Sequence, residues 1–144
     1  MDKQIELQQW MEIADNDLYL AMFSSQNMHP VSYAIMYFHC QQTVEKYLKW
    51  FLVLHDIEPP KIHDLEELEK LCENIQPLFS EIFEKCSILS SYAVQSRYPN
   101  EMYLEKNDMD RAIKYAKEIR EFISSFYPDQ FNPLPEVKSD RSKI

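Results

Sequence analysis

The segment VSYAIMYFHCQQTVEKYLKWFLVLH, residues 31–55, decides the fold class. Its apolar positions recur every three or four residues, the spacing of one face of an α-helix, and they are Tyr33, Tyr37, Cys40, Val44, Leu48 and Phe51. Apolar side chains also occupy much of the remaining circumference, as in a helix that other helices surround. The segment therefore predicts the central helix of an all-α domain.

Four further amphipathic segments flank this helix in the sequence, and proline or polar residues separate them. They predict helices over residues 3–25, 64–75, 77–98 and 107–126. Asp64 suits the N-cap of its helix, and Pro77 suits a first turn. Either Asn107 or Asp108 is expected to cap the last helix. Long helices with short connections predict an antiparallel up-and-down bundle of about five helices.

The composition bounds the domain organisation and excludes several chemistries. The 144 residues fit one domain, with a helical bundle over residues 1–127 and a flexible polar tail over residues 128–144. The chain contains no glycine, which excludes the phosphate-binding loops and nucleophile elbows that depend on glycine backbone geometry. The net charge of −9 argues against sequence-independent binding of nucleic acid.

The three cysteines, Cys40, Cys72 and Cys86, each lie inside an apolar helical pattern, and no CxxC pair occurs. Buried, reduced thiols of this kind predict a cytoplasmic protein. No two histidines have the i, i+4 spacing of a helical zinc site, so neither a metal nor another cofactor is expected. No segment approaches the roughly 18 apolar residues of a membrane helix, so no membrane contact is expected.

The densest polar cluster lies on the central helix. Gln42, Lys46 and Lys49 share one side of that helix by their spacing. Gln41 and Glu45 lie beside them, next to the apolar stripe. One interpretation is a solvated helix face with a Glu45–Lys49 ion pair, and the other is a ligand site.

Two helix ends carry further candidate residues. His63 and Asp64 precede a helix whose N-terminus could bind an anion, unless Asp64 only caps the helix and His63 packs nearby. Arg97 and Tyr98 precede Pro99, and the guanidinium could bind a phosphate or only complement the helix dipole.

Two other polar stretches are interpreted as solvated faces. One is Asp15-Asn16-Asp17 on the first helix, where residues two apart diverge around the helix. The other is the basic series on the last helix, which drifts around its circumference among glutamates: Arg111, Lys114, Lys117 and Arg120.

Four short motifs occur in a fixed order along about 5–126. They are Trp10 with Ala14-Asp15-Asn16-Asp17-Leu18, then Gln-Gln-x-x-Glu-Lys-x-Leu-Lys from Gln41 to Lys49, then His63-Asp64-Leu65, and finally Arg97-Tyr98-Pro99. In this order and spacing the motifs resemble the HEPN family of small helical domains. The resemblance implies an antiparallel bundle, usually a homodimer, that is often encoded beside or fused to a minimal nucleotidyltransferase.

Two subgroups of that family differ in what they imply. The chain looks most like the C-terminal helical domain of kanamycin-type nucleotidyltransferases, which assists substrate binding. The other subgroup consists of ribonuclease toxins with an Arg-x(4–6)-His motif. Here all four histidines precede Arg97, the first of four arginines, so that motif is absent in any register. This absence argues against an enzyme, and no catalytic residue is assigned.

We therefore expect a nucleotide-, substrate- or partner-binding module that works with a nucleotidyltransferase, or forms one half of a toxin–antitoxin pair. The expected ligand-binding residues are Gln42, Glu45, Lys46, Lys49, His63, Asp64, Arg97 and Tyr98. One alternative is a ribonuclease that uses Arg97 and His63 across a dimer interface. Another is a purely structural dimeric interaction domain, in which the motif residues form a buried polar network.

Overall fold

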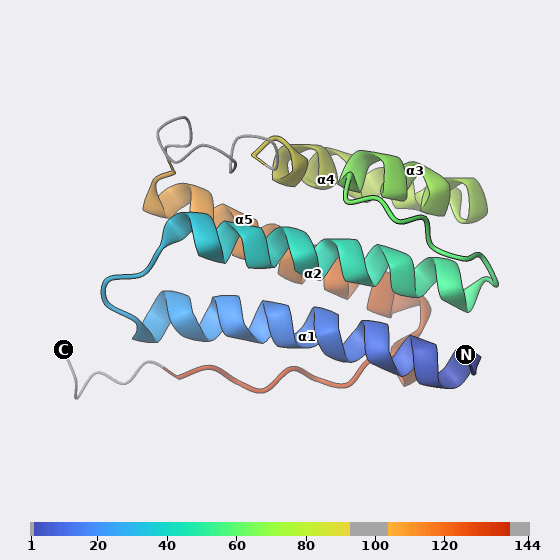
Figure 1. The fold of residues 1–144 in the computed structure, drawn as a ribbon, viewed down its shortest axis with the longest axis horizontal. Coiled ribbons are helices and arrows are strands. Elements are labelled where there is room, and N and C mark those ends of the chain that lie inside the picture. The colour runs from blue at the N-terminus through green and yellow to red at the C-terminus, as the bar shows by residue number, and fades with distance from the viewer. Residues whose placement is uncertain (1, 93–103, 139–144) are drawn as a thin grey trace.

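Five α-helices follow one another along residues 2–92 and 104–138, the part of the chain that the computed structural model describes. They are α1 (Lys3–Asn27), α2 (Tyr33–Leu54), α3 (Leu65–Ile75), α4 (Phe83–Ser90) and α5 (Lys106–Phe126), with short 3-10 helices η1 (Pro77–Ile82) and η3 (Pro128–Gln130). No strand occurs within these ranges. The predicted all-α bundle of about five helices is confirmed (Figure 1).

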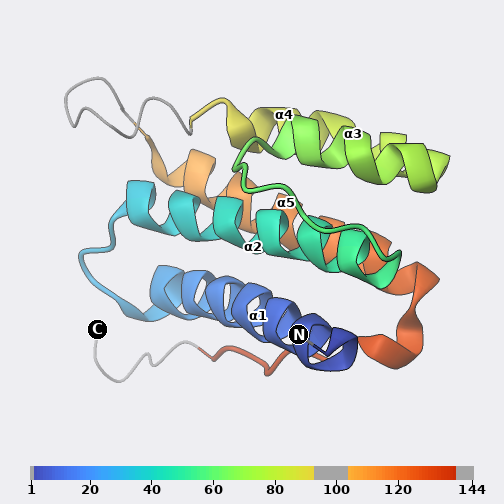
Figure 2. The ribbon, with the colours of Figure 1, turned by 45° about the vertical axis from the view of Figure 1, so that its right-hand side comes forward.

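The helix α2 lies at the centre of the bundle, as its sequence predicts. It packs against α1 on one side, α5 on another, and α3 and α4 on a third (Figures 1 and 2). Small residues bring α1 close, because Ala14 and Ala21 are fully buried against the core. Trp50 and Phe51 fill the far end of α2 with aromatic rings. Within the described residues, no helix combines the length and the apolarity that crossing a bilayer requires.

The end of α2 shows how a chain without glycine reverses direction. Asp56 adopts φ = 61°, the left-handed conformation that usually selects glycine and that aspartate tolerates better than most residues. The Ile57 N–H donates to the Leu52 carbonyl at 2.9 Å, and the Asp56 N–H donates to the Val53 carbonyl at 3.0 Å. These two bonds form a Schellman motif, which ends α2 and begins the loop before α3.

Two helix starts differ from the sequence prediction. The N-cap of α5 is Glu105, not Asn107 or Asp108, and Asp108 instead accepts the Glu105 N–H at 2.9 Å in a capping box. The helix predicted from Pro77 begins as the 3-10 helix η1 and becomes α-helical only at Phe83. The 3-10 spacing places Phe79 and Ile82, three residues apart, on the same buried side. The helix ends at Ser90, earlier than predicted, because residues 91 and 92 form a turn. The predicted continuation from residue 93 lies outside the described residues.

The chain after α5 returns along α1 (Figures 1 and 2). The Phe131 ring packs edge-on against Trp50 at 5.1 Å between centroids, and the Arg120 guanidinium lies 5.3 Å from its centre. Leu134 also packs against the core. The boundary at residue 127 and the flexibility of the tail stay predictions, but the described part of this segment contacts the bundle.

Replacing Phe131 with alanine is expected to lower the free energy of unfolding by about 2 kcal/mol, because a half-buried ring and its edge-on contact are lost. Chemical denaturation followed by circular dichroism measures this change. Glu136→Ala, an exposed substitution in the same segment, serves as the control and should change little. An equal effect of both substitutions would show that Phe131 does not anchor the segment.

The three cysteines are free thiols in the core, as predicted. Burial, with Asp17 nearby, raises the pKa of Cys40 to about 12. Burial likewise raises the pKa of Cys72 and of Cys86 far above the ordinary thiol value. All three sulfurs are therefore protonated and shielded in the folded protein.

Candidate functional site

A buried carboxylate on α2 gathers three cationic or ionisable side chains around it. The Glu45 side chain is only 2% exposed. Its Oε2 accepts from the Lys46 Nζ at 2.6 Å and from the Lys49 Nζ at 3.2 Å. Its Oε1 lies 2.8 Å from the His63 Nδ1, which must carry the proton because an ionised carboxylate can only accept. We call these four residues the Glu45 cluster.

Two elements build the Glu45 cluster, and a third packs against it. Glu45, Lys46 and Lys49 come from consecutive turns of α2, and the i, i+4 spacing joins Glu45 to Lys49. His63 arrives on the loop that crosses back over the bundle before α3 (Figure 1). Trp10 comes from α1, and both lysine Nζ atoms lie 5.7 Å from the centre of its ring. The aromatic face therefore stabilises the two ammonium groups.

The electrostatics of the Glu45 cluster favour an ionised carboxylate. Burial by itself would raise the pKa of Glu45, but hydrogen bonds from Lys46 and His63 and the charges of both lysines outweigh it and lower the pKa below the usual value of 4.5. The carboxylate neutralises one of the two ammonium charges. The His63 side chain remains 79% exposed, so its Nε2 edge faces solvent.

The structure excludes one of the interpretations of this segment. The solvated helix face is wrong, because Glu45 and Lys49 are buried, although the expected Glu45–Lys49 ion pair is present. The alternative of a buried polar network describes the geometry. Gln42 lies on the same helix, half-buried. A ligand-binding role for these residues stays a prediction.

Asp64 caps α3, as its position predicts. Its Oδ1 accepts from the Glu66 N–H at 2.9 Å and from the Glu67 N–H at 3.3 Å. The cap also sets the end of the loop that presents His63. Arg97 and Tyr98, the two other predicted site residues, lie outside the described residues.

Asp64→Ala is expected to lower the free energy of unfolding by about 1 kcal/mol, because two N–H groups of α3 lose their acceptor. Thermal denaturation measures the loss. Asp64→Asn keeps a side-chain oxygen at the cap and should retain most of the stability. A loss of equal size in both variants would contradict a capping role and indicate a role for the charge.

A second polar cluster joins α1, α2 and α5 and was not predicted. The Arg120 Nε donates to the Asp15 Oδ1 at 3.0 Å, and the Tyr47 hydroxyl donates to the same carboxylate. Arg120 also donates to the Asn132 carbonyl of the C-terminal segment. The solvated-face interpretation is therefore wrong for Asp15 and Arg120. The one feature of the sequence that points to this second cluster is Tyr47, because the hydroxyl of a tyrosine buried on the central helix needs a hydrogen-bond partner.

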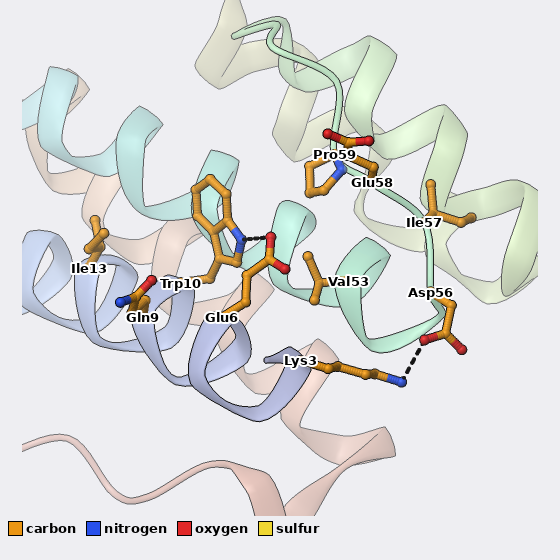
Figure 3. A pocket seen from close by; sticks show the side chains of 10 residues that line it. All are labelled: Lys3, Glu6, Gln9, Trp10, Ile13, Val53, Asp56, Ile57, Glu58 and Pro59. Carbon is orange, nitrogen blue, oxygen red and sulfur yellow. Dashed lines mark hydrogen bonds and ion pairs between the residues drawn. The ribbon is translucent and has the colours of Figure 1, made fainter. Parts of the chain in front are cut away.

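An open pocket lies beside the Glu45 cluster, between the first turns of α1 and the loop after α2 (Figure 3). Its volume is about 600 Å³. It is lined by Lys3, Glu6, Gln9, Trp10, Ile13, Val53, Asp56, Ile57, Glu58 and Pro59. Of the predicted site residues that the structure describes, none lines this pocket. In the described part of the chain, no group of three or more His, Cys, Asp or Glu side chains is placed to hold a metal ion.

The fold and the Glu45 cluster together define a small helical domain built around one central helix. Within that class, the chain belongs to the HEPN family, because the HEPN domain family model matches residues 7–132. The family suspected from the four motifs is thereby confirmed over most of the sequence. A comparison with curated proteins finds no match, and neither does a comparison with solved structures.

Proposed function

We propose that this chain is a cytoplasmic, homodimeric partner-binding module that works with a nucleotidyltransferase, as one half of a toxin–antitoxin pair. The observation that carries the proposal is a set of large apolar side chains that are exposed near one end of the α1–α2 hairpin. It is formed by Leu20 and Phe23 of α1 and by Ile35 and Phe38 of α2, all of them exposed. We call these four residues the hairpin patch.

The four residues of the hairpin patch belong to one end of the hairpin. The His39 Nδ1 lies 3.1 Å from the Asp17 Oδ1, which fixes the two helices at this level. Leu20 follows Asp17 by one turn of α1, and Phe38 is next to His39 on α2. Large apolar side chains that gather on the surface are typical of protein–protein contacts. Because domains of this family commonly dimerise, a second copy is the first occupant to test.

The hairpin patch predicts a dimer that charge can disrupt. The wild-type chain is expected to show twice its mass of 17.3 kDa in light scattering. The double substitution Ile35→Lys and Phe38→Lys is expected to weaken the dimer at least tenfold, because two ammonium groups would have to be desolvated. Leu78→Lys, which charges an exposed apolar residue of η1, is the matched control and should leave the dimer intact. A monomeric wild type, or equal dissociation of both variants, would contradict the use of this surface.

The transferase half of the proposal has its own test. A neighbouring reading frame that encodes a Gly-Ser turn and a paired DxD strand would supply the partner, and the two proteins should co-purify.

The nucleotide half of the proposal rests on Lys46 and His63, whose side chains are 17% and 79% exposed to solvent. Lys49, Arg97 and Tyr98 are further candidates. Calorimetric titration with ATP, with and without the transferase, measures it. Absence of heat in both titrations would remove the nucleotide from the proposal and leave the partner.

One observation favours the ribonuclease alternative as a second candidate. Glu45 holds the His63 Nδ1, so the Nε2 is presented to solvent as a proton acceptor, the arrangement of an oriented general base. Purified protein incubated with RNA tests this, with His63→Ala and Arg97→Ala as variants. Cleavage that both substitutions abolish would place the enzyme ahead of the binding module. Intact RNA in all three samples would remove it.

A further inference from the structure

The C-terminal segment lies on the bundle in the way that a bound peptide would. We call residues 131–138 the C-terminal strap, which has no regular secondary structure and follows α1 (Figures 1 and 2). Phe131, Leu134 and Val137 are half-buried, whereas the residues between them are exposed. A period of three residues is that of a polyproline II helix. The two prolines of the strap favour this conformation, because each fixes its own φ and keeps the preceding residue extended.

Side chains of the bundle hold the strap near both of its ends. The Arg120 guanidinium donates to the Asn132 carbonyl and is itself fixed by the Asp15 carboxylate at 3.0 Å. The Asn27 Nδ2 donates to the Lys138 carbonyl at 3.3 Å. The six residue steps from 132 to 138 cover about 19 Å in polyproline II, and the twelve from 15 to 27 cover about 18 Å of α1. Both contacts are made to main-chain carbonyls, which any extended peptide offers.

The C-terminal strap leaves part of its site open. One hollow of about 510 Å³ lies beside Asn132, between α1 and Trp50. Another of about 440 Å³ lies beside Leu134 and Val137, between α1 and α5. In the described part of the chain, no backbone N–H of the strap donates a hydrogen bond. A peptide with larger side chains at these positions would therefore bury more surface here than the strap does.

From these observations we propose that the surface under the C-terminal strap is a docking site for an extended, proline-containing segment of another protein, and that the strap occupies this site in the free chain as an autoinhibitory peptide. The partner segment places an apolar side chain at every third position, as Phe131, Leu134 and Val137 do. Its main-chain carbonyls accept from Arg120 and Asn27. Polyproline II segments suit such recognition because their conformation is largely formed before they bind.

The tether to α5 makes the C-terminal strap a competitor of any partner. Only Tyr127 and the 3-10 helix η3 separate the strap from α5. A connection this short gives the strap an effective concentration on the order of millimolar. A free peptide therefore binds poorly to the wild-type chain and well to a variant whose strap has lost its anchoring side chains. The docking site shares no residue with the hairpin patch, so its test does not depend on the proposed dimer.

Binding of the strap sequence as a separate peptide provides the test. The triple substitution Phe131→Ala, Leu134→Ala and Val137→Ala in the full chain removes the anchors and keeps the tether. The Phe131 ring lies 5.1 Å from the Trp50 ring, so the indole N–H signal of Trp50 in a heteronuclear NMR spectrum reports on a ring at this position. Trp10→Phe shows which of the two tryptophan signals belongs to Trp50. The probe is the blocked peptide Phe-Asn-Pro-Leu-Pro-Glu-Val-Lys, the sequence of the strap.

The peptide is expected to return the Trp50 signal of the triple variant toward its wild-type position, saturably and in the millimolar range or below. Binding to the wild-type chain should be at least tenfold weaker, because the tethered strap competes. Glycine in place of both prolines of the peptide should weaken binding on the order of tenfold, because the free peptide then has more conformations to lose. A peptide with serine in place of its leucine and valine is the matched control and should lose most of the affinity.

Three results would overturn the proposal. The first is the absence of a saturable shift in a folded triple variant, and the second is equal binding of the peptide to the wild type and the variant. The third is loss of the helical circular dichroism signal both in the triple variant and in Phe131→Ala alone, which would show that the strap is a part of the core. If only the triple variant unfolds, the titration is made on Phe131→Ala, whose Trp50 signal the peptide must restore.

Discussion

Glu45→Leu is expected to lower the free energy of unfolding by about 3–5 kcal/mol, the cost of breaking a buried ion pair from one side. The substitution leaves the Lys49 side chain, 6% exposed, and the Lys46 side chain, 17% exposed, without a counter-charge. The Trp10 ring offsets only a part of this cost, on the order of 1–2 kcal/mol. Urea denaturation followed by circular dichroism measures the change.

A double substitution tests whether uncompensated lysine charges cause this loss of stability. Glu45→Leu combined with Lys49→Leu removes both buried charges and should recover most of the stability, since apolar replacement of a buried ion pair is often nearly neutral. Glu12→Gln, an exposed carboxylate on α1, is the control and should change the stability by less than about 0.5 kcal/mol. A small loss in Glu45→Leu itself would show that both lysines reach water in the variant.

The carboxylate also gives the Glu45 cluster a defined pH dependence. Its pKa in the folded protein lies below the usual 4.5, so the folded state binds the proton less tightly than the unfolded state. The stabilisation that the ionised Glu45 carboxylate provides is therefore complete at pH values above its pKa in the unfolded chain. It is lost as the pH falls through the pKa of Glu45 in the folded protein.

Glu69→Gln is expected to increase stability at pH 8 by on the order of 2 kcal/mol and to change it little at pH 5. Glu69 of α3 is fully buried, and no described group donates a hydrogen bond to either carboxyl oxygen. Burial, together with Glu73 one turn away, raises the pKa of Glu69 to about 7. The folded state therefore holds a proton that the unfolded state releases at about pH 4.5, so stability falls as the pH rises from about 4.5 to 7.

Denaturation curves between pH 5 and pH 8 test this sign. The wild type should lose stability over that interval, and Glu69→Gln should lose much less. Glu67→Gln, an exposed substitution on the same helix, should keep the wild-type slope. A wild-type stability that rises with pH would show that Glu69 is ionised and paired in the folded protein.

The central helix could be predicted from the sequence because its spacing and apolar circumference are local properties. The Glu105 cap was missed because glutamate is an unusual N-cap residue, whereas the nearby asparagine and aspartate are common ones. The prediction for Asp64 succeeded because the cap contacts only the next residues of the same chain segment.

The contacts of the site depend on tertiary structure and could be predicted only in part. The i, i+4 spacing correctly predicted the Glu45–Lys49 pair, but it could not show that other helices would bury it. His63 reaches Glu45 through the path of a loop, which no pattern in the sequence specifies. Arg120 and Asp15 are 105 positions apart, so their contact exists only once the bundle has assembled.

The reactivity of the three buried thiols can be used to measure local unfolding of this protein. Cys40 lies on α2, Cys72 on α3 and Cys86 on α4, so three neighbouring helices each carry one sulfur. Because a disulfide reagent reacts with thiolates, and burial keeps these groups protonated, each modification must wait for the surrounding helix to open. The order in which the three sulfurs react with such a reagent would therefore rank the opening free energies of these helices in the native chain, without an engineered label.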